Sequence, residues 1–202
     1  MCDGGGAEVK GSIGNNSGEI QPWELLDSSL LMSQQPWLTV YREKVRLPNG
    51  RVLDDFYRVA LPEFAVIVAV TSDKELVMVR SYKHGPKRIC LSAPAGLVES
   101  GERPLETAQR ELLEETGYTA PEWRSLGRFV VDGNRQCGTA HLFLARHAVQ
   151  IASGNQGDET EDVQVVLMNP HHFLQAVRDS DVVLLSTVSA VALAMVVGLN
   201  EI

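Results

Sequence analysis

Apolar and polar residues along the first half of the chain follow the short period of β-strands. Residues 38–47 (LTVYREKVRL) and 51–61 (RVLDDFYRVAL) flank the turn Pro48-Asn49-Gly50 and predict a hairpin. A second pair of strands is predicted at 64–70 (FAVIVAV) and 75–83 (ELVMVRSYK). Because the first of these runs is almost continuously apolar, we expect it to be a central strand that is buried on both faces. Later strands are predicted at 124–131, 139–149 and 163–168.

Helical periodicity begins after residue 103. Pro104 suits the first turn of a helix and Gly117 is a stop signal, and between them an apolar stripe is expected from Leu105, Ala108, Leu112 and Thr116. Helices are also expected near 171–179 and from Val182 onward. The stretch 182–199 carries no charge over 18 residues, but serines, a threonine and a glycine interrupt it and no basic flank follows. We interpret it as a buried helix covering the sheet, with a dimer contact or membrane association as the alternatives.

Composition agrees with a single-domain soluble enzyme. A chain of 202 residues with 44% hydrophobic content can bury one core. Its net charge of −8 argues against a nucleic-acid partner, since such binding relies on Lys and Arg at phosphates. Cys2, Cys90 and Cys137 are odd in number and widely spaced, which favours reduced thiols and a cytoplasmic location. Residues 1–20 are polar and glycine-rich without the pattern of a secretory signal, and predict a flexible tail.

Acidic residues gather on one face of the predicted helix at 104–116. Glu111 and Glu115 are four residues apart and share that face, with Glu114 beside them. These carboxylates repel one another, but each attracts a hard divalent cation. Such a cation is bound by carboxylate oxygens together with the phosphates of a substrate. Arg110 precedes Glu114 by four residues and can orient a carboxylate. A solvated acidic face is the alternative, but it does not require glycines and an arginine at fixed offsets.

The run Gly96–Tyr118 resembles the Nudix box, the signature of the Nudix hydrolase family, with every defining position filled. The resemblance implies an α/β (α+β) fold: an α/β/α sandwich around a mixed sheet (63–202), preceded by small N-terminal antiparallel strands (21–62). It also implies hydrolysis of a nucleoside diphosphate linked to another moiety, with Mg²⁺ or Mn²⁺ as cofactor. By this resemblance, metal ligation belongs to the Ala95 carbonyl, Glu111 and Glu115, catalysis involves Arg110 and Glu114, and structural support comes from Gly96, Glu102 and Gly117.

Segments 38–61, 79–85 and 93–96 are similar to the ADP-ribose pyrophosphatase branch of this family. That branch implies a homodimer formed through the N-terminal strands and a glutamate from a later loop beside the metals. No membrane partner is expected, in line with a buried helix at 182–199. In the acidic segment 157–166 we expect Glu159 to be the general base and Glu161 an added metal ligand, with Asp158 and Asp162 as less favoured substitutes. An ordinary acidic surface loop is the alternative.

The substrate is expected to be a small nucleotide, ADP-ribose or an ADP-sugar, cleaved to AMP and a sugar phosphate. Candidate phosphate or ribose contacts are Arg80, Lys83, His84 and Arg135. Trp37, Phe56 or Tyr57 can stack on a base, although aromatic residues at strand spacing are more typical of a core. The chain departs from the branch at two positions, with Ser92 in place of a glutamate and Asn134 in place of a proline. Another nucleotide sugar or a damaged nucleotide therefore remains an alternative substrate. A non-catalytic nucleotide sensor is a further alternative, against which the intact glutamates count.

Overall fold

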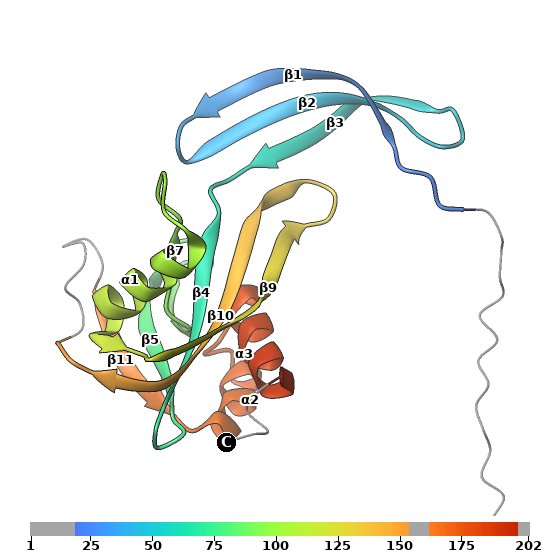
Figure 1. Ribbon diagram of the computed structural model, residues 1–202. Coiled ribbons are helices and arrows are strands. Elements are labelled where there is room, and N and C mark those ends of the chain that lie inside the picture. The colour runs from blue at the N-terminus through green and yellow to red at the C-terminus, as the bar shows by residue number, and fades with distance from the viewer. Residues whose placement is uncertain (1–18, 154–161, 198–202) are drawn as a thin grey trace, which may run out of the picture.

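The computed structural model describes residues 19–153 and 162–197 (Figure 1). A sheet of eleven strands, with three helices packed on its faces, forms this part of the chain. The elements are β1 (Glu24–Gln34), β2 (Leu38–Arg46), β3 (Val52–Ala60), β4 (Phe64–Thr71), β5 (Leu76–Lys83), β6 (Arg88–Ser92), β7 (Ala95–Leu97), α1 (Pro104–Thr116), β8 (Tyr118–Thr119), β9 (Glu122–Asp132), β10 (Gln136–Gln150), β11 (Val163–Met168), α2 (Pro170–Arg178) and α3 (Leu185–Val197).

The sheet is mixed, which confirms the predicted fold class. Its main path runs β1-β2-β3-β10-β4-β5-β11, while β6 pairs with β5, β7 with β4, and β8 and β9 with β10. The pairs β10–β4 and β10–β3 are parallel and the others are antiparallel. Both predicted hairpins are present, as β2–β3 and β4–β5.

Strand β4 is the centre of the core, as its continuous apolar run predicts. Successive side chains of a strand point to opposite faces of the sheet. On one face Ala65, Ile67 and Ala69 pack in a cluster with residues of α1. On the other face the cluster contains Val66, Val68 and Val70 together with residues of α2 and α3. Helices on both faces explain why β4 has no polar side.

Helix α1 begins at Pro104 and ends before Gly117, as predicted. Gly117 has φ 74°, a left-handed conformation in which its N–H donates to the carbonyl of Leu113. Ala108, Leu112 and Thr116 are fully buried against the sheet. Leu105 is 38% exposed, so its place in the buried stripe was wrong. It lies in the first turn, and the face of the helix that packs on the sheet begins with Thr107 and Ala108.

Strands β1, β2 and β3 form an antiparallel sheet that projects from the body of the molecule (Figure 1). It joins the rest through the link after Ala60 and through the pairing of Val59 with Gln136. The guanidinium of Arg58 adds a hydrogen bond of 3.1 Å to the side-chain oxygen of Gln136. Strand β1 was not predicted, because all but one of its side chains are exposed and they show no alternation.

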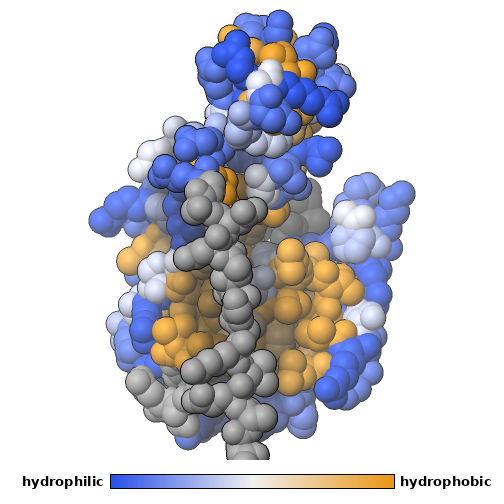
Figure 2. Space-filling model, turned by 90° about the vertical axis from the view of Figure 1, so that its right-hand side faces the viewer, coloured by the Kyte–Doolittle hydropathy of each residue, from blue (hydrophilic) through white to orange (hydrophobic). Residues whose placement is uncertain are grey.

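The C-terminal segment forms α3 and covers one face of the sheet, as predicted. Thr187, Ala190, Val191 and Ala194 are buried there. None of the helices in the described ranges is long and apolar enough to cross a membrane. The described cysteines, Cys90 and Cys137, are free thiols. Seen from the side of α3, apolar residues still gather on the surface of the body (orange in Figure 2).

Candidate active site

The acidic face of α1 lies directly against β7. Glycine is required at position 96 because a Cβ there would lie 1.9 Å from both Cδ and Oε1 of Glu111. The absence of a side chain therefore lets the Glu111 carboxylate lie against the strand. Its side chain is only 15% exposed.

Strand β7 turns one edge of its backbone toward α1. The carbonyl of Pro94 accepts from Ile67 N–H (2.9 Å), and Val98 N–H donates to the carbonyl of Glu63 (2.9 Å). The backbone polar groups of residues 94, 96 and 98 therefore point toward β4. Residues 95 and 97 must then face away from β4, because backbone groups alternate along a strand. Accordingly Ala95 N–H donates to Oε2 of Glu115 (3.0 Å) and the Leu97 carbonyl accepts from Arg110 (3.2 Å). The Ala95 carbonyl lies on this same edge, the one that faces α1, because the N–H and C=O of one strand residue share an edge.

Arg110 connects the acidic residues of the site. Its Nη1 donates to Glu111 (2.7 Å) and to Glu114 (3.0 Å), while Nε and Nη2 donate to the two oxygens of Glu102 (3.0 and 3.1 Å). These carboxylates raise the pKa of the guanidinium, chiefly the one on Glu102. The guanidinium of Arg110 is thus hydrogen-bonded to three carboxylates at once.

Glu102 is a structural partner of Arg110 and, unlike Glu111 and Glu114, does not line the cavity. It also accepts from the buried hydroxyl of Thr107 (2.7 Å). The hydrogen bonds from Arg110, and secondarily from Thr107, lower the pKa of Glu102 from 4.5 to about 2. The carboxylate therefore stays ionised and keeps Arg110 in place at any physiological pH.

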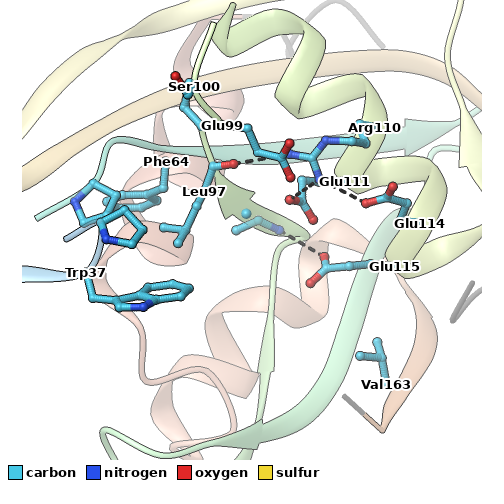
Figure 3. Close-up of a pocket in the computed structure, with 15 residues that line it drawn as sticks. Trp37, Phe64, Leu97, Glu99, Ser100, Arg110, Glu111, Glu114, Glu115 and Val163 are labelled. Carbon is cyan, nitrogen blue, oxygen red and sulfur yellow. Dashed lines mark hydrogen bonds and ion pairs between the residues drawn. The ribbon is translucent and has the colours of Figure 1, made fainter. Parts of the chain in front are cut away.

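A cavity of about 790 Å³ opens beside this network. Glu111, Glu114 and Glu115 line one side, and Trp37, Phe64 and Leu97 face them from the other (Figure 3). Glu99 and Ser100 of the loop before α1 lie at one end and Val163 at the other. The cavity therefore has a charged wall that suits a metal and a diphosphate, and an apolar, aromatic wall that suits a flat ring.

Each of the three glutamates on the charged wall accepts a hydrogen bond from a donor within the protein. Glu111 and Glu114 turn to Arg110, and Glu115 turns to the amide of Ala95. As a result, no three acidic, histidine or cysteine side chains of residues 19–153 and 162–197 converge closely enough to hold a metal ion. The three glutamates and the backbone of Ala95 share one wall of the cavity. Oxygen donors of this kind suit a hard divalent cation.

The structure gathers one part of the predicted site and separates another. Ala95, Gly96, Arg110, Glu111, Glu114 and Glu115 all line the cavity. The lining does not include the predicted substrate contacts: Arg80, Lys83 and His84 lie on β5 and its turn to β6, and Arg135 is in the β9–β10 turn beside β3. Asp158, Glu159 and Glu161 lie outside the described residues, and Asp162 is exposed.

Sequence reasoning missed most of the apolar wall. Phe64 and Leu97 had no local signal, because they resemble ordinary core residues until strand pairing places them next to each other. Trp37 was weighed as a base-stacking residue, and its 65% exposure is unusual for a core tryptophan. Of its two alternatives, Phe56 packs edge-on against Trp23 at 5.4 Å and Tyr57 lies on β3 outside the lining.

Two family models match the chain. One, described as the NUDIX domain, matches residues 61–185, and the other, the nucleoside diphosphate sugar hydrolase N-terminal domain, matches residues 23–59. The first model alone covers more than half of the chain. The second corresponds to the projecting strands β1–β3.

Individual proteins show the same similarity. The ADP-ribose pyrophosphatase of Bacillus subtilis (strain 168) is 32% identical over 72% of this chain and 78% of its own length. A methanol dehydrogenase activator of Bacillus methanolicus is 30% identical, over 74% of this chain and 80% of its own. Among solved structures, an ADP compounds hydrolase superposes with a TM-score of 0.75 at 25% identity, covering 89% of this chain and 95% of that one.

Proposed function

The chain belongs to the Nudix family of hydrolases, and on that basis we propose that it cleaves the diphosphate of a nucleoside diphosphate sugar, with ADP-ribose as the leading substrate. The products are AMP and a sugar phosphate. The observation that carries the proposal is the cavity with three glutamates on one wall and Trp37 on the other. The names of the relatives, which include an ADP-ribose pyrophosphatase and an ADP compounds hydrolase, support the choice of substrate.

Members of this family act with a divalent metal, and we propose Mg²⁺ or Mn²⁺ here. The residues that would hold it are Glu111, Glu115 and the Ala95 carbonyl, which lie together on the charged wall. When bound, the cation neutralises the diphosphate and makes an attacking water easier to deprotonate. Glu114, which shares Arg110 with Glu111, lies close enough to assist.

The remaining residues orient the groups that react. Arg110 holds Glu111 and Glu114 on the side that faces the diphosphate, and Glu102 in turn holds Arg110. We propose Glu159 as the base that takes the proton of the attacking water, with Glu161 as an added metal ligand. The water forms a bond to one phosphorus as the bridging oxygen leaves in line with it on the other phosphate.

The apolar wall suits the nucleobase. Trp37, Phe64 and Leu97 lie across the cavity from the glutamates (Figure 3). Stacking on an aromatic side chain stabilises a bound base by about 1 to 3 kcal/mol. We therefore propose that Trp37, which belongs to the β1–β2 turn, binds the base, while the diphosphate lies at the wall where the glutamates of α1 would hold the metal.

We further propose that the protein acts as a homodimer in the cytoplasm. The support is the projecting sheet, which exposes 43% of Met32 and more than half of Leu25, Leu30 and Leu31. Large exposed apolar surfaces mark protein interaction sites, and a second copy of the chain can cover this one. Light scattering coupled to gel filtration should give twice the mass of the chain, and a monomer at micromolar concentration would exclude the dimer. The free thiols of Cys90 and Cys137 fit a reducing compartment.

Chromatography of the products tests the activity. Purified full-length protein is incubated with ADP-ribose, ADP-glucose, GDP-mannose or NADH, with Mg²⁺ and after chelation. We expect metal-dependent release of AMP from ADP-ribose. Glu111→Gln should reduce kcat/KM at least about 100-fold, because even residues that only support metal ligands cost about 10- to 100-fold.

Glu106→Gln is the matched control, since Glu106 lies on the same helix but bonds Arg103 outside the cavity. It should keep full activity. If no compound of the panel is hydrolysed with metal present, the proposed activity is wrong. If ADP-ribose is cleaved no better than GDP-mannose or NADH, the substrate assignment is wrong while the activity stands.

A further inference from the structure

Three elements hold the backbone that precedes Gly96. Ala93 N–H donates to the side-chain oxygen of Thr187 on α3, at 3.2 Å. The carbonyl of Pro94 accepts from β4, and Ala95 N–H donates to Glu115 on α1. Pro94 also restricts Ala93 to extended conformations, because its ring excludes a helical residue before it. The direction of the Ala95 carbonyl is therefore set jointly by α3, β4 and α1.

Among the residues that hold this backbone segment, Thr187 is unusual because its polar side chain is almost fully buried. It lies in the first turn of α3 and is 1% exposed. The other buried residues of this helix are Ala190, Val191 and Ala194, so the threonine hydroxyl lies in an otherwise apolar surface. Its oxygen provides the partner for Ala93 N–H, and Ala93 is itself only 2% exposed. A buried N–H without a partner is costly, which gives the hydroxyl a specific task.

The C-terminal segment also holds the strand before Ala93. The amide of Leu91 donates to the carbonyl of Asp181, at 2.8 Å. Leu91 and Ala93 are alternate residues of one extended stretch, so both contacts act on the same edge of the backbone. The segment that leads to the metal site is thus held by the part of the chain that follows β11.

We propose that Thr187 is a positioning residue for the metal site: by holding Ala93, it fixes the direction of the Ala95 carbonyl. This inference rests on the proposed function, in which that carbonyl is a metal ligand. Thr187 is not among the residues that line the cavity, and its side-chain oxygen accepts a hydrogen bond from the backbone of Ala93. Its loss should therefore weaken metal binding while the nucleobase wall stays as it is.

The test is direct Mn²⁺ binding to the full-length protein, followed by electron paramagnetic resonance. Thr187→Val keeps the shape of the side chain and removes the hydroxyl. We expect the Kd for Mn²⁺ to rise about 10-fold, the lower end of the effect of residues that orient metal ligands. Thr187→Ser, which keeps the hydroxyl, should restore the wild-type value. If the valine variant does not fold, Thr187→Ala addresses the same bond.

Val191→Ala is the matched control for a loss of packing. Val191 is fully buried in the same helix, so this variant should unfold more easily and still bind Mn²⁺ with the wild-type Kd. An unchanged Kd for Mn²⁺ in Thr187→Val would overturn the role of Thr187, and so would a rise in Val191→Ala as large as that in Thr187→Val. Either result would leave the proposed metal site intact. If the wild-type protein does not bind Mn²⁺, the proposed metal site fails and the role of Thr187 fails with it.

Discussion

Replacing Gly96 with alanine should strongly reduce activity with little effect on stability. The new Cβ would lie 1.9 Å from Cδ and Oε1 of Glu111 and 2.5 Å from Oε2. Carbon atoms in contact lie about 3.5 to 4.0 Å apart, so the carboxylate must move by about 1.6 to 2.1 Å. Misplacing a group of the site by about 1 Å can cost about 100-fold in rate. We therefore expect kcat/KM to fall at least about 100-fold, or about 2.7 kcal/mol.

The cost in stability is smaller because the clashing atoms belong to the free end of a long side chain. Gly96 lies in an extended strand, where alanine is accepted without backbone strain. Glu111 can turn into the cavity, and Arg110 keeps its bonds to Glu102, Glu114 and the Leu97 carbonyl. We expect the free energy of unfolding to fall by less than about 1.5 kcal/mol, at the low end for losing one charged hydrogen bond.

Steady-state kinetics with ADP-ribose and urea unfolding measure the two effects. Gly85→Ala is the neutral control, because Gly85 has no neighbour within 4 Å of the added Cβ. Gly101→Ala adds backbone strain without a steric clash, since Gly101 has φ +85° and, like Gly85, no neighbour within 4 Å of the added Cβ. Wild-type kinetics in Gly96→Ala would refute the close approach of Glu111 to β7. A similar loss of activity in Gly101→Ala would instead assign the effect to the loop.

Three further predictions address separate parts of the site. The pKa of Glu102 is lowered to about 2, so its ionised form stabilises the fold above about pH 4.5 and this contribution is lost as the pH falls toward 2; Glu102→Gln should flatten the acid dependence of urea unfolding in that window, and an unchanged dependence would contradict the Arg110 network. Trp37→Ala should raise KM about 5- to 150-fold with kcat kept, from the loss of about 1 to 3 kcal/mol of stacking, whereas a fall in kcat alone would argue against base binding. Glu159→Gln should lower kcat at least about tenfold with unchanged thermal unfolding; turnover close to wild type would assign the base to another residue.

The charged half of the site follows from local sequence, and the structure agrees with it. The start and stop of α1 depend on Pro104 and Gly117, which act within one turn of the helix. Glutamates three or four residues apart share a face of any helix, so Glu111 and Glu115 could be placed side by side without knowing the fold. The strand patterns of β2 to β5, including the continuous apolar run of β4, are equally local, which is why these strands were predicted.

The other half depends on contacts between distant segments. Trp37 reaches the cavity because the β1–β2 turn lies near the link between β3 and β4, and no periodicity encodes that position. Arg80, Lys83 and His84 were chosen because cations are scarce in this chain and these three lie in one short segment, but they are not among the residues that line the cavity. Strand β1 was not predicted from its residue pattern, because nearly all of its side chains are exposed and no alternation of apolar and polar positions marks the strand.

The position of β4 has a consequence for synthesis of the protein. One edge of this strand meets β5 and β7, which follow it closely along the chain, but the other edge pairs with residues 140–148 of β10. At a ribosomal rate of about 5 to 20 residues per second, β10 arrives about 4 to 15 s later. During that time the most hydrophobic strand of the protein offers an unpaired edge, which is a template for aggregation. We expect the yield of soluble protein to depend on chaperones and temperature through β4, independently of the stability of the finished fold.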